Sequence, residues 1–209
     1  MDSTGIFTAT GLLLGAYLLG SIPSGLIIVR LLTGKDVRKH GSGNIGMVNV
    51  FRTAGNTAGV LTFVTDGLKG FLPVFAATLL GAPVWLTLGT AAAAILGHNW
   101  SIILRGKGGK GIATSVGTIG AIAPLIGLGA IGIWLVLLTV TRYASLSSML
   151  MLAMVPPALA LAGYDWPYVL YAAGLFALAV IQHRPNIDRL RQGSELEFRL
   201  GSAAVRHGE

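Results

Sequence analysis

The stretch IFTATGLLLGAYLLGSIPSGLIIVRLL, from Ile6 to Leu32, decides the fold class. Its one charged residue, Arg30, stands near its end. A transmembrane helix needs about 20 consecutive, largely apolar residues, and this stretch is long enough. The residues before it, Met1-Asp2-Ser3, include no Lys or Arg. A cleaved signal peptide begins with a basic region, so we interpret the stretch as a retained membrane anchor.

The composition of the whole chain supports a membrane protein. Of the 209 residues, 53% are hydrophobic and 11% are charged, and the mean hydropathy is +0.73. A typical soluble domain has about 25% charged residues. The chain has no cysteine, which excludes disulfides, thiolate metal sites and a cysteine nucleophile.

Further apolar segments predict more membrane spans. The region from Thr57 to Leu104 accommodates two spans, with a turn at Gly81-Ala82-Pro83. The region from Ile112 to Val140 is too long for one straight span and short for two, and Pro124 divides it into two abbreviated helices. Two more spans are Leu146 to Ala162 and Pro167 to Gln182, joined by residues 163–166. We predict an all-α integral membrane bundle of seven transmembrane helices, with five spans as the alternative. Residues 1–209 then form a single domain, with an accessory tail beyond about residue 195.

The basic residues indicate the orientation of this bundle. All fifteen Lys and Arg residues lie in or beside four regions: 30–69, 105–110, Arg142 and 184–206. With seven spans these regions share one side, whereas a five-span chain must place Arg142 differently. Because basic loops stay in the cytoplasm, we expect the N-terminus outside and the C-terminus inside. Basic residues beside spans, without an aromatic-rich soluble domain, also argue against nucleic-acid binding.

The first polar loop contains GSGNIG, from Gly41 to Gly46, which fits the G-x-G-x-x-G pattern of dinucleotide-binding turns. That pattern requires a preceding strand, and residues 35–40 do not read as one, so we reject the dinucleotide interpretation. Glycines let backbone N–H groups approach an anion, and arginine presents a fork of donors to phosphate. A tight turn with Asn44 as a helix cap is an equally good interpretation. The candidate anion-binding residues here are Gly41, Ser42, Gly43, Asn44, Asn49 and Arg52.

A second loop reads GKGGKG, from Gly106 to Gly111. It is not a nucleotide P-loop, because Ile and Ala follow where that motif requires Lys and Ser or Thr. The loop still has two ammonium groups among glycines, and it leads into a helix. This pattern favours an anion-binding site over a basic loop that only sets the membrane orientation. The candidates are Lys107, Gly108, Gly109 and Lys110.

Two further segments contain polar residues beside spans. Arg142 stands near the bilayer, where a charge needs a partner, and Ser145 follows it. His183 ends a span, where an imidazole titrates near neutral pH, and Asn186 follows. Interfacial anchoring is the alternative for each segment, and a hydrogen bond within the bundle is the expected role of His98. The eight acidic residues are scattered, so we expect no metal site.

Together these segments resemble a known family. GSGNIGxxNxxR, Asp66-x-x-Lys69-Gly70, GHNW, GKGGKG, RYxSLSS and HRxNIxRL occur in the order typical of the bacterial acyl-phosphate:glycerol-3-phosphate acyltransferases. The resemblance extends from about Gly20 to Glu195. This chain departs from the family pattern at Ile45, Met47 and Val48, which affects the shape of the loop rather than the activity.

The resemblance implies a seven-helix enzyme of the bacterial inner membrane. It would move a fatty acyl group from acyl phosphate to sn-glycerol 3-phosphate, giving lysophosphatidic acid and phosphate, without a cofactor. This is the first acylation of phospholipid synthesis. The active site would lie on the cytoplasmic side, and we expect a monomer.

The chemistry of the two substrates suggests roles for the candidate residues. We expect Arg52, Lys107, Lys110 and Arg142 to neutralise the two phosphates, and Ser42, Asn44, Ser145 and Asn186 to orient substrate oxygens. His183 would hydrogen-bond the acceptor and serve as general base, unless the donor's own phosphate takes the proton. Ser42 and Asn186 complete the expected catalytic group. The alternatives are a transporter of an anionic metabolite and a noncatalytic membrane interaction protein.

Overall fold

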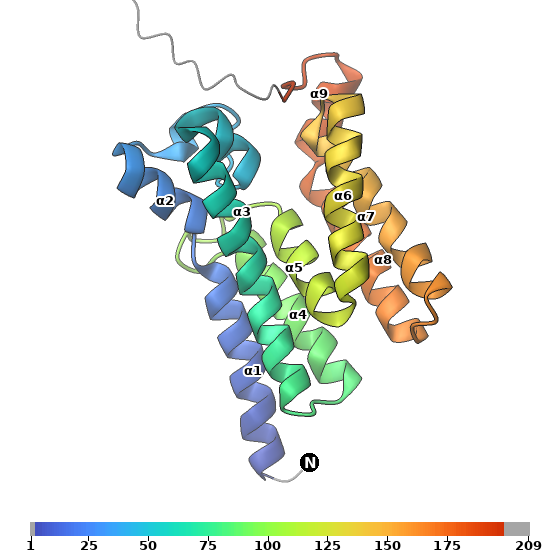
Figure 1. Cartoon of the computed structure of the whole chain (residues 1–209). Coiled ribbons are helices and arrows are strands. Elements are labelled where there is room, and N and C mark those ends of the chain that lie inside the picture. The colour runs from blue at the N-terminus through green and yellow to red at the C-terminus, as the bar shows by residue number, and fades with distance from the viewer. Residues whose placement is uncertain (1–2, 199–209) are drawn as a thin grey trace, which may run out of the picture.

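The computed structural model describes residues 3–198, and every regular element among them is a helix, which confirms the all-α prediction (Figure 1). The elements are α1 (Ser3–Ser21), α2 (Ser24–Thr33), the 3₁₀ helix η1 (Val37–Lys39), α3 (Met47–Leu79), α4 (Val84–Asn99), α5 (Ile112–Ile122), α6 (Pro124–Thr141), α7 (Ala144–Leu161), α8 (Trp166–Gln182) and α9 (Arg184–Arg191). The predicted accessory tail lies, from residue 199 onward, outside the described residues.

Two breaks shape the first half of the chain. The Ile6–Leu32 stretch is not one helix: α1, which begins at Ser3, stops at Ser21, and α2 starts at Ser24, after Pro23. Helix α3 starts at Met47 and continues through a break at Gly55, whose φ of 85° and ψ of −177° are not helical. The sequence predicted that Asn49 and Arg52 lie in a polar loop before the apolar region that begins at Thr57. The early start of α3 corrects this and places the candidate side chains Asn49 and Arg52 on its first turns.

The predicted division at Pro124 is confirmed, because α5 ends at Ile122 and Pro124 opens α6. Helix α5 has 11 residues and is about 16 Å long, roughly half of the hydrocarbon core of a bilayer. Within residues 3–198, four helices are long and apolar enough to cross a membrane. A fifth is added if α8 and α9, which meet at 60°, count as one span. The chain is thus a multi-pass membrane protein with four to five candidate spans by length and composition.

The helices form two groups that meet at α5 (Figure 1). Helix α1 packs against α4 and α3 against α5, while α6, α7 and α8 pack in sequence order. Glycines permit the closest approaches: a Cβ on Gly97 would lie 2.1 Å from the Tyr17 carbonyl oxygen, and one on Gly117 would lie 2.0 Å from that of Gly67.

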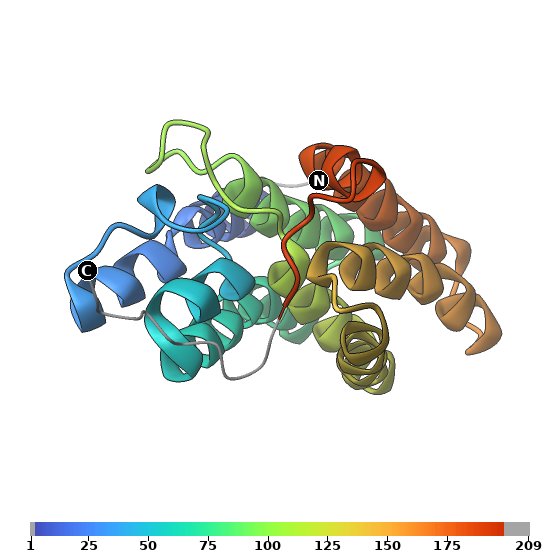
Figure 2. The same cartoon turned by 90° about the horizontal axis from the view of Figure 1, so that it is seen from above.

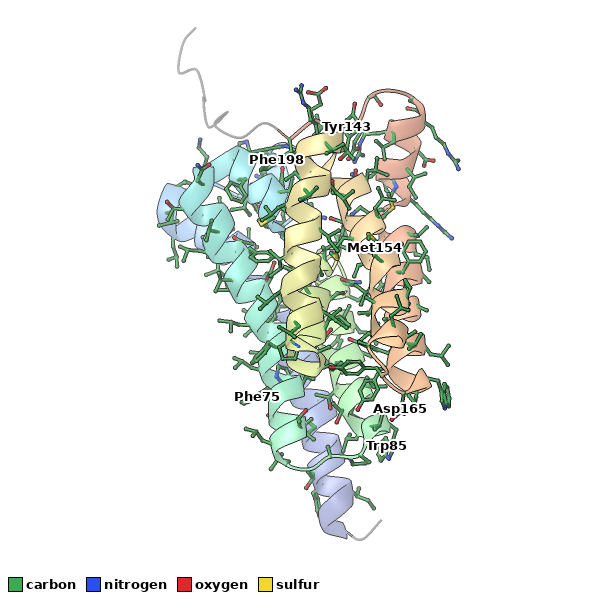
Figure 3. The ribbon with its side chains drawn as sticks, turned by 45° about the vertical axis from the view of Figure 1, so that its right-hand side comes forward. Phe75, Trp85, Tyr143, Met154, Asp165 and Phe198 are labelled. Carbon is green, nitrogen blue, oxygen red and sulfur yellow. The ribbon has the colours of Figure 1, made fainter. Side chains whose placement is uncertain are left out.

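The two ends of the bundle differ in what they contain. The start of α1 lies at one end, and Trp85 and Asp165 lie toward that end, whereas Tyr143 and Phe198 lie at the other (Figures 1 and 3). Seen from above, the segment after α9 crosses the top of the molecule from α9 toward α3 and α6 (Figure 2). We call residues 194–198 the strap. The strap therefore closes the end at which the polar loops gather.

Candidate active site

A pocket lies beneath the strap, among α3, α5, α7 and the junction of α8 with α9. Segments far apart in the sequence contribute its polar lining: Ser42, Asn44, Asn49, Arg52, Asp66, His98, Lys110, Ser145, Ser148, His183, Asn186, Arg189 and Glu195. Eight of the candidate site residues are in this set: Ser42, Asn44, Asn49, Arg52, Lys110, Ser145, His183 and Asn186. Each of the four predicted segments thus contributes at least one residue to the pocket, although Arg142 itself does not line it.

Asn49 organises the first loop from inside. Its side chain is buried; its amide nitrogen donates to the carbonyl oxygens of Val37, His40 and Asn44 at 3.2, 3.0 and 2.8 Å, and its oxygen accepts from the Ser42 N–H at 2.9 Å. Gly41 and Gly43 adopt the left-handed backbone that this loop needs, with φ of 56° and 72°.

The Asn44 side chain makes a local turn. Its oxygen accepts a hydrogen bond from the Gly46 N–H at 2.7 Å, which is the arrangement of an Asx turn just before α3. GSGNIG is therefore a tight turn as expected, but Asn44 does not cap α3, whose N-cap residue is Gly46. The turn still leaves Asn44 and Ser42 on the pocket wall.

Arg52 links α3 to the strap. Its Nη2 donates to the carbonyl oxygens of Leu196 at 2.9 Å and Glu197 at 3.2 Å. Both bonds come from one nitrogen of the guanidinium, which has five N–H donors. Nη1 and Nε make no hydrogen bond with the described residues, so the fork keeps donors for a ligand in the pocket.

Glu195 is the centre of a hydrogen-bond network that joins three elements. Its Oε1 accepts from Ser145 Oγ at 2.8 Å and from Asn186 Nδ2 at 2.6 Å, and its Oε2 accepts from Arg189 Nε at 2.7 Å. The amide oxygen of Asn186 in turn accepts a hydrogen bond from the Lys110 ammonium. The Glu195 side chain is 6% exposed, so the strap inserts a carboxylate among the donors of the pocket.

Burial and the neighbouring groups of this network together shift the pKa values of Lys110 and Glu195. Burial lowers the pKa of Lys110 to about 8; the nearby Glu195 carboxylate opposes this shift, and Arg189 and Arg52 add to it. Burial raises the pKa of Glu195, but hydrogen bonds from Asn186, Ser145 and Arg189 outweigh it and leave that pKa below its ordinary value. Lys110 is thus a cation poised to lose its proton slightly above neutral pH.

His183 lines the pocket, and one of its two ring nitrogens already makes a hydrogen bond within the protein. The residue is buried, and its Nδ1 lies 2.8 Å from the Ala179 carbonyl oxygen, one helical turn earlier. Because a carbonyl oxygen only accepts hydrogen bonds, Nδ1 is the nitrogen that holds the proton. In the neutral ring Nε2 then has a lone pair available for a proton or a hydroxyl donor.

An apolar cavity adjoins the polar pocket. Its lining includes Phe51, Val60, Leu135 and Leu138 from α3 and α6. The two cavities share Met47, Phe63, Ile131 and Trp134, so these four side chains form the boundary between them. Trp134 is fixed there by a hydrogen bond from its Nε1 to Ser148 Oγ at 3.0 Å.

Comparisons with known proteins agree on one family. The family model described as glycerol-3-phosphate acyltransferase matches residues 10–193. The chain belongs to the glycerol-3-phosphate acyltransferase family. The relative from Rubrobacter xylanophilus is 46% identical over 187 residues, covering 90% of this chain and 94% of its own, and that from Desulforudis audaxviator is 43% identical over 198 residues, covering 95% and 98%. Both relatives are glycerol-3-phosphate acyltransferases.

Solved structures of the family have the same fold. Two crystal structures of PlsY, an integral membrane glycerol 3-phosphate acyltransferase, superimpose with TM-scores of 0.87 and 0.85 at 39% and 37% identity. Each covers 92% of this chain and 96% of its own; one is the glycerol 3-phosphate form and the other the lysophosphatidic acid form. The present chain is accordingly an enzyme, a membrane-integral glycerol-3-phosphate acyltransferase that produces lysophosphatidic acid for phospholipid synthesis.

The glycine segment 106–111 of this acyltransferase differs from the expected cradle of free amides. The N–H of Gly108 donates to the Asn99 carbonyl oxygen at 3.1 Å, and that of Gly109 donates to the His98 carbonyl oxygen at 3.0 Å. Both amides thus donate to the end of α4, so neither of these two candidate residues has a free N–H for an anion. Lys107 is exposed and lies outside the pocket lining, whereas Lys110 is inside it.

Arg142 likewise lies apart from the polar pocket. It caps α6 in the left-handed conformation, with φ of 60°, and its exposed side chain lines the apolar cavity. Its carbonyl oxygen accepts a hydrogen bond from the Phe198 N–H at 2.8 Å, while the Phe198 ring packs edge-on against Phe51 at 5.8 Å between centroids. Arg142 therefore anchors the strap through its backbone.

The sequence prediction omitted four ionisable residues that line the pocket: Asp66, His98, Arg189 and Glu195. The signal for the first was present, because Asp66 stands three residues before Lys69 within an apolar helix, where a charge requires a partner. Arg189 had a signal as well, because it is part of the motif HRxNIxRL, whereas nothing in the spacing of Glu195 distinguishes it from an ordinary polar tail. Among residues 3–198 no group of three or more His, Asp or Glu side chains is arranged to hold a metal ion.

Proposed function

We propose that the polar pocket binds the phosphates of acyl phosphate and of sn-glycerol 3-phosphate, while the adjoining apolar cavity holds the acyl chain. The observation that supports this best is the shared boundary of the two cavities, a cationic one and a hydrocarbon-lined one. Acyl phosphate has the same division, because a phosphate is attached directly to a long apolar chain. Its reactive carbonyl would lie at the boundary near Trp134.

Two cations that line the pocket, Arg52 and Lys110, would bind the phosphates. Arg52 presents its two unused nitrogen donors, and Lys110 presents an ammonium held by Asn186. Ser42 and Asn44 on the first loop would orient substrate oxygens beside Arg52, together with the loop glycines Gly41 and Gly43. Lys107 and Arg142, outside the pocket, would attract anionic substrates toward its mouth.

The reaction needs a single acyl transfer. The 1-hydroxyl oxygen of glycerol 3-phosphate attacks the carbonyl carbon, a C–O bond forms, and the C–O bond to the departing phosphate breaks with its electron pair. The hydroxyl proton passes to Nε2 of His183 or to the departing phosphate. Holding the hydroxyl against the carbonyl supplies much of the rate, because the donor is already activated. Ser145 and Asn186, fixed on Glu195, keep the surrounding donors in place.

The topology that fits this function has seven transmembrane segments, with the N-terminus outside and the site on the cytoplasmic face of the inner membrane. The split of α5 and α6 at Pro124 supports it, as does the location of the strap at the end opposite the start of α1. We further propose that one chain suffices as a monomer, that residues 1–209 form one domain, and that residues beyond the strap are accessory.

A donor-exchange experiment tests the proposal. The purified protein in detergent is given labelled glycerol 3-phosphate with acyl phosphate, with acyl-CoA or with acyl carrier protein, and lysophosphatidic acid is separated by thin-layer chromatography. Product from acyl phosphate alone is expected. Equal product from acyl-CoA would refute the proposed donor. Uptake of labelled glycerol 3-phosphate into sealed vesicles without a donor would favour the transporter alternative instead.

A further inference from the structure

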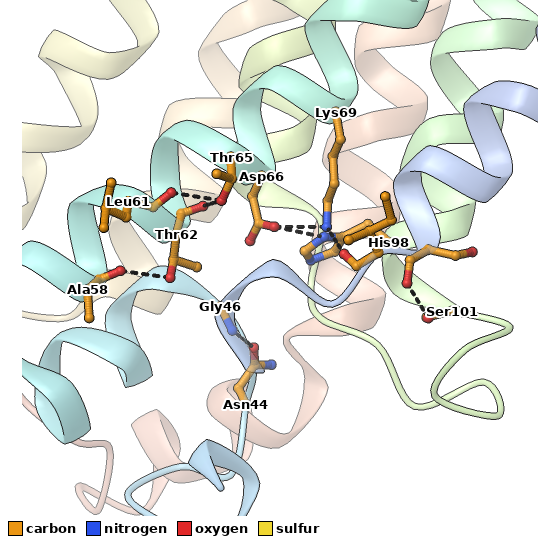
Figure 4. Close-up of polar contacts among 12 residues, drawn as sticks. Asn44, Gly46, Ala58, Leu61, Thr62, Thr65, Asp66, Lys69, His98 and Ser101 are labelled. Carbon is orange, nitrogen blue, oxygen red and sulfur yellow. Dashed lines mark hydrogen bonds and ion pairs between the residues drawn. The ribbon is translucent and has the colours of Figure 1, made fainter. Parts of the chain in front are cut away.

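Three ionisable side chains are buried together beside the pocket, where α3, α4 and the break between α1 and α2 meet (Figure 4). They are Asp66, Lys69 and His98, each 4% exposed or less. The Lys69 ammonium lies 2.8 Å from Asp66 Oδ1 and donates to the Ile22 carbonyl oxygen at 2.9 Å. His98 Nδ1 lies 3.8 Å from the same Asp66 oxygen. We call these three residues the buried triad.

A buried charge pair is costly to desolvate, so its presence in an apolar helix calls for a function. Lys69 is not among the residues that line the pocket, whereas Asp66 and His98 form part of its inner wall. At the Pro23 break the Ile22 carbonyl oxygen accepts hydrogen bonds from the Ser24 N–H at 3.0 Å and from the Lys69 ammonium at 2.9 Å, so Lys69 ties α3 to this break. The triad thus connects three separate backbone segments directly behind the pocket.

His98 contacts the glycine segment through both its backbone and its ring. Its carbonyl oxygen accepts the Gly109 N–H at 3.0 Å. A Cβ built on Gly109 would lie 2.2 Å from His98 Nε2, closer than real Cβ contacts come. Gly109 has no unusual φ, so the ring alone, and not backbone strain, excludes a side chain there. Lys110, the next residue, enters the pocket directly from this contact.

From these contacts we propose that the buried triad positions Lys110 for the acyltransferase reaction. Asp66, held by Lys69, faces the His98 ring. The ring and the carbonyl oxygen of His98 then fix the position of Gly109, and through it the position of the Lys110 ammonium. The residues of the triad are positioning residues. The inference rests on the proposed role of Lys110 in phosphate binding.

The contact between His98 and Gly109 allows a test by mutual compensation. Gly109→Ala is expected to lower kcat/KM by about tenfold or more, because its methyl group must displace the ring, a loss of roughly 1.4 kcal/mol of transition-state binding. His98→Ala alone is expected to raise the KM for a phosphorylated substrate by about threefold to tenfold with little change in kcat. The double variant, in which the new methyl group enters the space left by the ring, is expected to match or exceed the activity of His98→Ala.

Gly108→Ala is the matched control. A Cβ on Gly108 would lie 1.9 Å from the His98 carbonyl oxygen, a backbone atom that His98→Ala leaves in place. Combining Gly108→Ala with His98→Ala should therefore restore nothing. Equal rescue of both glycine variants, or rescue of neither, would overturn the proposal, provided that thermal unfolding in detergent shows each variant folded.

Asp66 is tested in a form that does not leave a lone buried charge. Asp66→Asn combined with Lys69→Met removes both charges, and it is expected to raise the same KM as His98→Ala while the unfolding temperature stays within a few degrees. An unchanged KM in this folded double variant would refute a positioning role. Lys110→Met tests phosphate binding by Lys110 separately from loop position. If this variant leaves both KM values unchanged, Lys110 does not bind a phosphate. The compensation between His98 and Gly109 reports independently on the position of the loop.

Discussion

The pKa of Lys110 predicts a pH dependence for substrate binding. Burial places this pKa at about 8, so the side chain changes charge within the range in which the enzyme is readily assayed. A lysine binds phosphate as an ammonium, which exists below its pKa and is lost above it. Raising the pH from 7 to 9 is therefore expected to weaken the binding of the phosphate that Lys110 contacts.

The size of the effect follows from the titration. With a pKa of about 8, the fraction of Lys110 that is charged falls from about nine-tenths at pH 7 to about one-tenth at pH 9. If only the ammonium form binds, the KM for one substrate rises by about tenfold over this interval, equivalent to about 1.4 kcal/mol. The substrate phosphates do not confuse the measurement, since the second pKa of a phosphate monoester is about 6.

The assay measures initial rates of lysophosphatidic acid formation at a series of pH values, varying each substrate in turn and subtracting spontaneous hydrolysis of acyl phosphate. Lys110→Arg is the control, because a guanidinium stays charged throughout this range and should remove the step. A wild-type KM that is flat from pH 7 to pH 9 for both substrates would contradict the reasoning. An equal rise in Lys110→Arg would assign the step to another group.

Three further predictions concern single residues. His183→Ala should lower kcat by about a hundredfold with normal folding if the imidazole is the general base, and by less than tenfold if the departing phosphate takes the proton; single-turnover rates distinguish the two. Glu195→Gln should destabilise the fold by about 2 kcal/mol at pH 7, because charge-assisted bonds to Arg189 and its neighbours weaken. Since the pKa of Glu195 lies below 4.5, the carboxylate stabilises fully above that value and its contribution is lost on acidification, so the gap in unfolding temperature between wild type and Glu195→Gln should shrink at low pH. Asn49→Ala removes four hydrogen bonds of one buried side chain and should cost about 3 kcal/mol with loss of activity, whereas a fall in unfolding temperature no larger than that of an exposed control would show that the first loop does not depend on it.

Much of the helical architecture was predictable because membrane spans are set by length and hydropathy. The turn at residues 81–83 and the split at Pro124 appear where the apolar runs are interrupted. The sequence prediction failed at the start of α3, where a polar segment is helical from Met47. Hydropathy has no signal for a polar helix that faces a pocket, and Gly55 within it reads as a loop residue.

The candidate site was predictable in its residue types but not in every role. In GKGGKG, glycines that cradle a phosphate and glycines that allow close packing produce the same letters. The two uses separate once the direction of each amide is known: Gly108 and Gly109 donate to the end of α4, and the space for their Cβ atoms is filled by His98. Glu195 was beyond prediction for another reason, since its importance depends on a strap that returns across the bundle.

The strap orders the polar side chains of the pocket in the absence of substrate. Arg52, Lys110 and Arg189 share one small cavity, and like charges at such range repel each other and favour disorder of their side chains. The Glu195 carboxylate supplies the missing acceptor by binding Arg189, Ser145 and Asn186 at once. It reaches Lys110 only through Asn186, so the ammonium is oriented without being neutralised by direct contact. If the pocket binds phosphate as proposed, the ligand meets donors that are already aligned, and folding rather than binding has supplied the free energy that orders them.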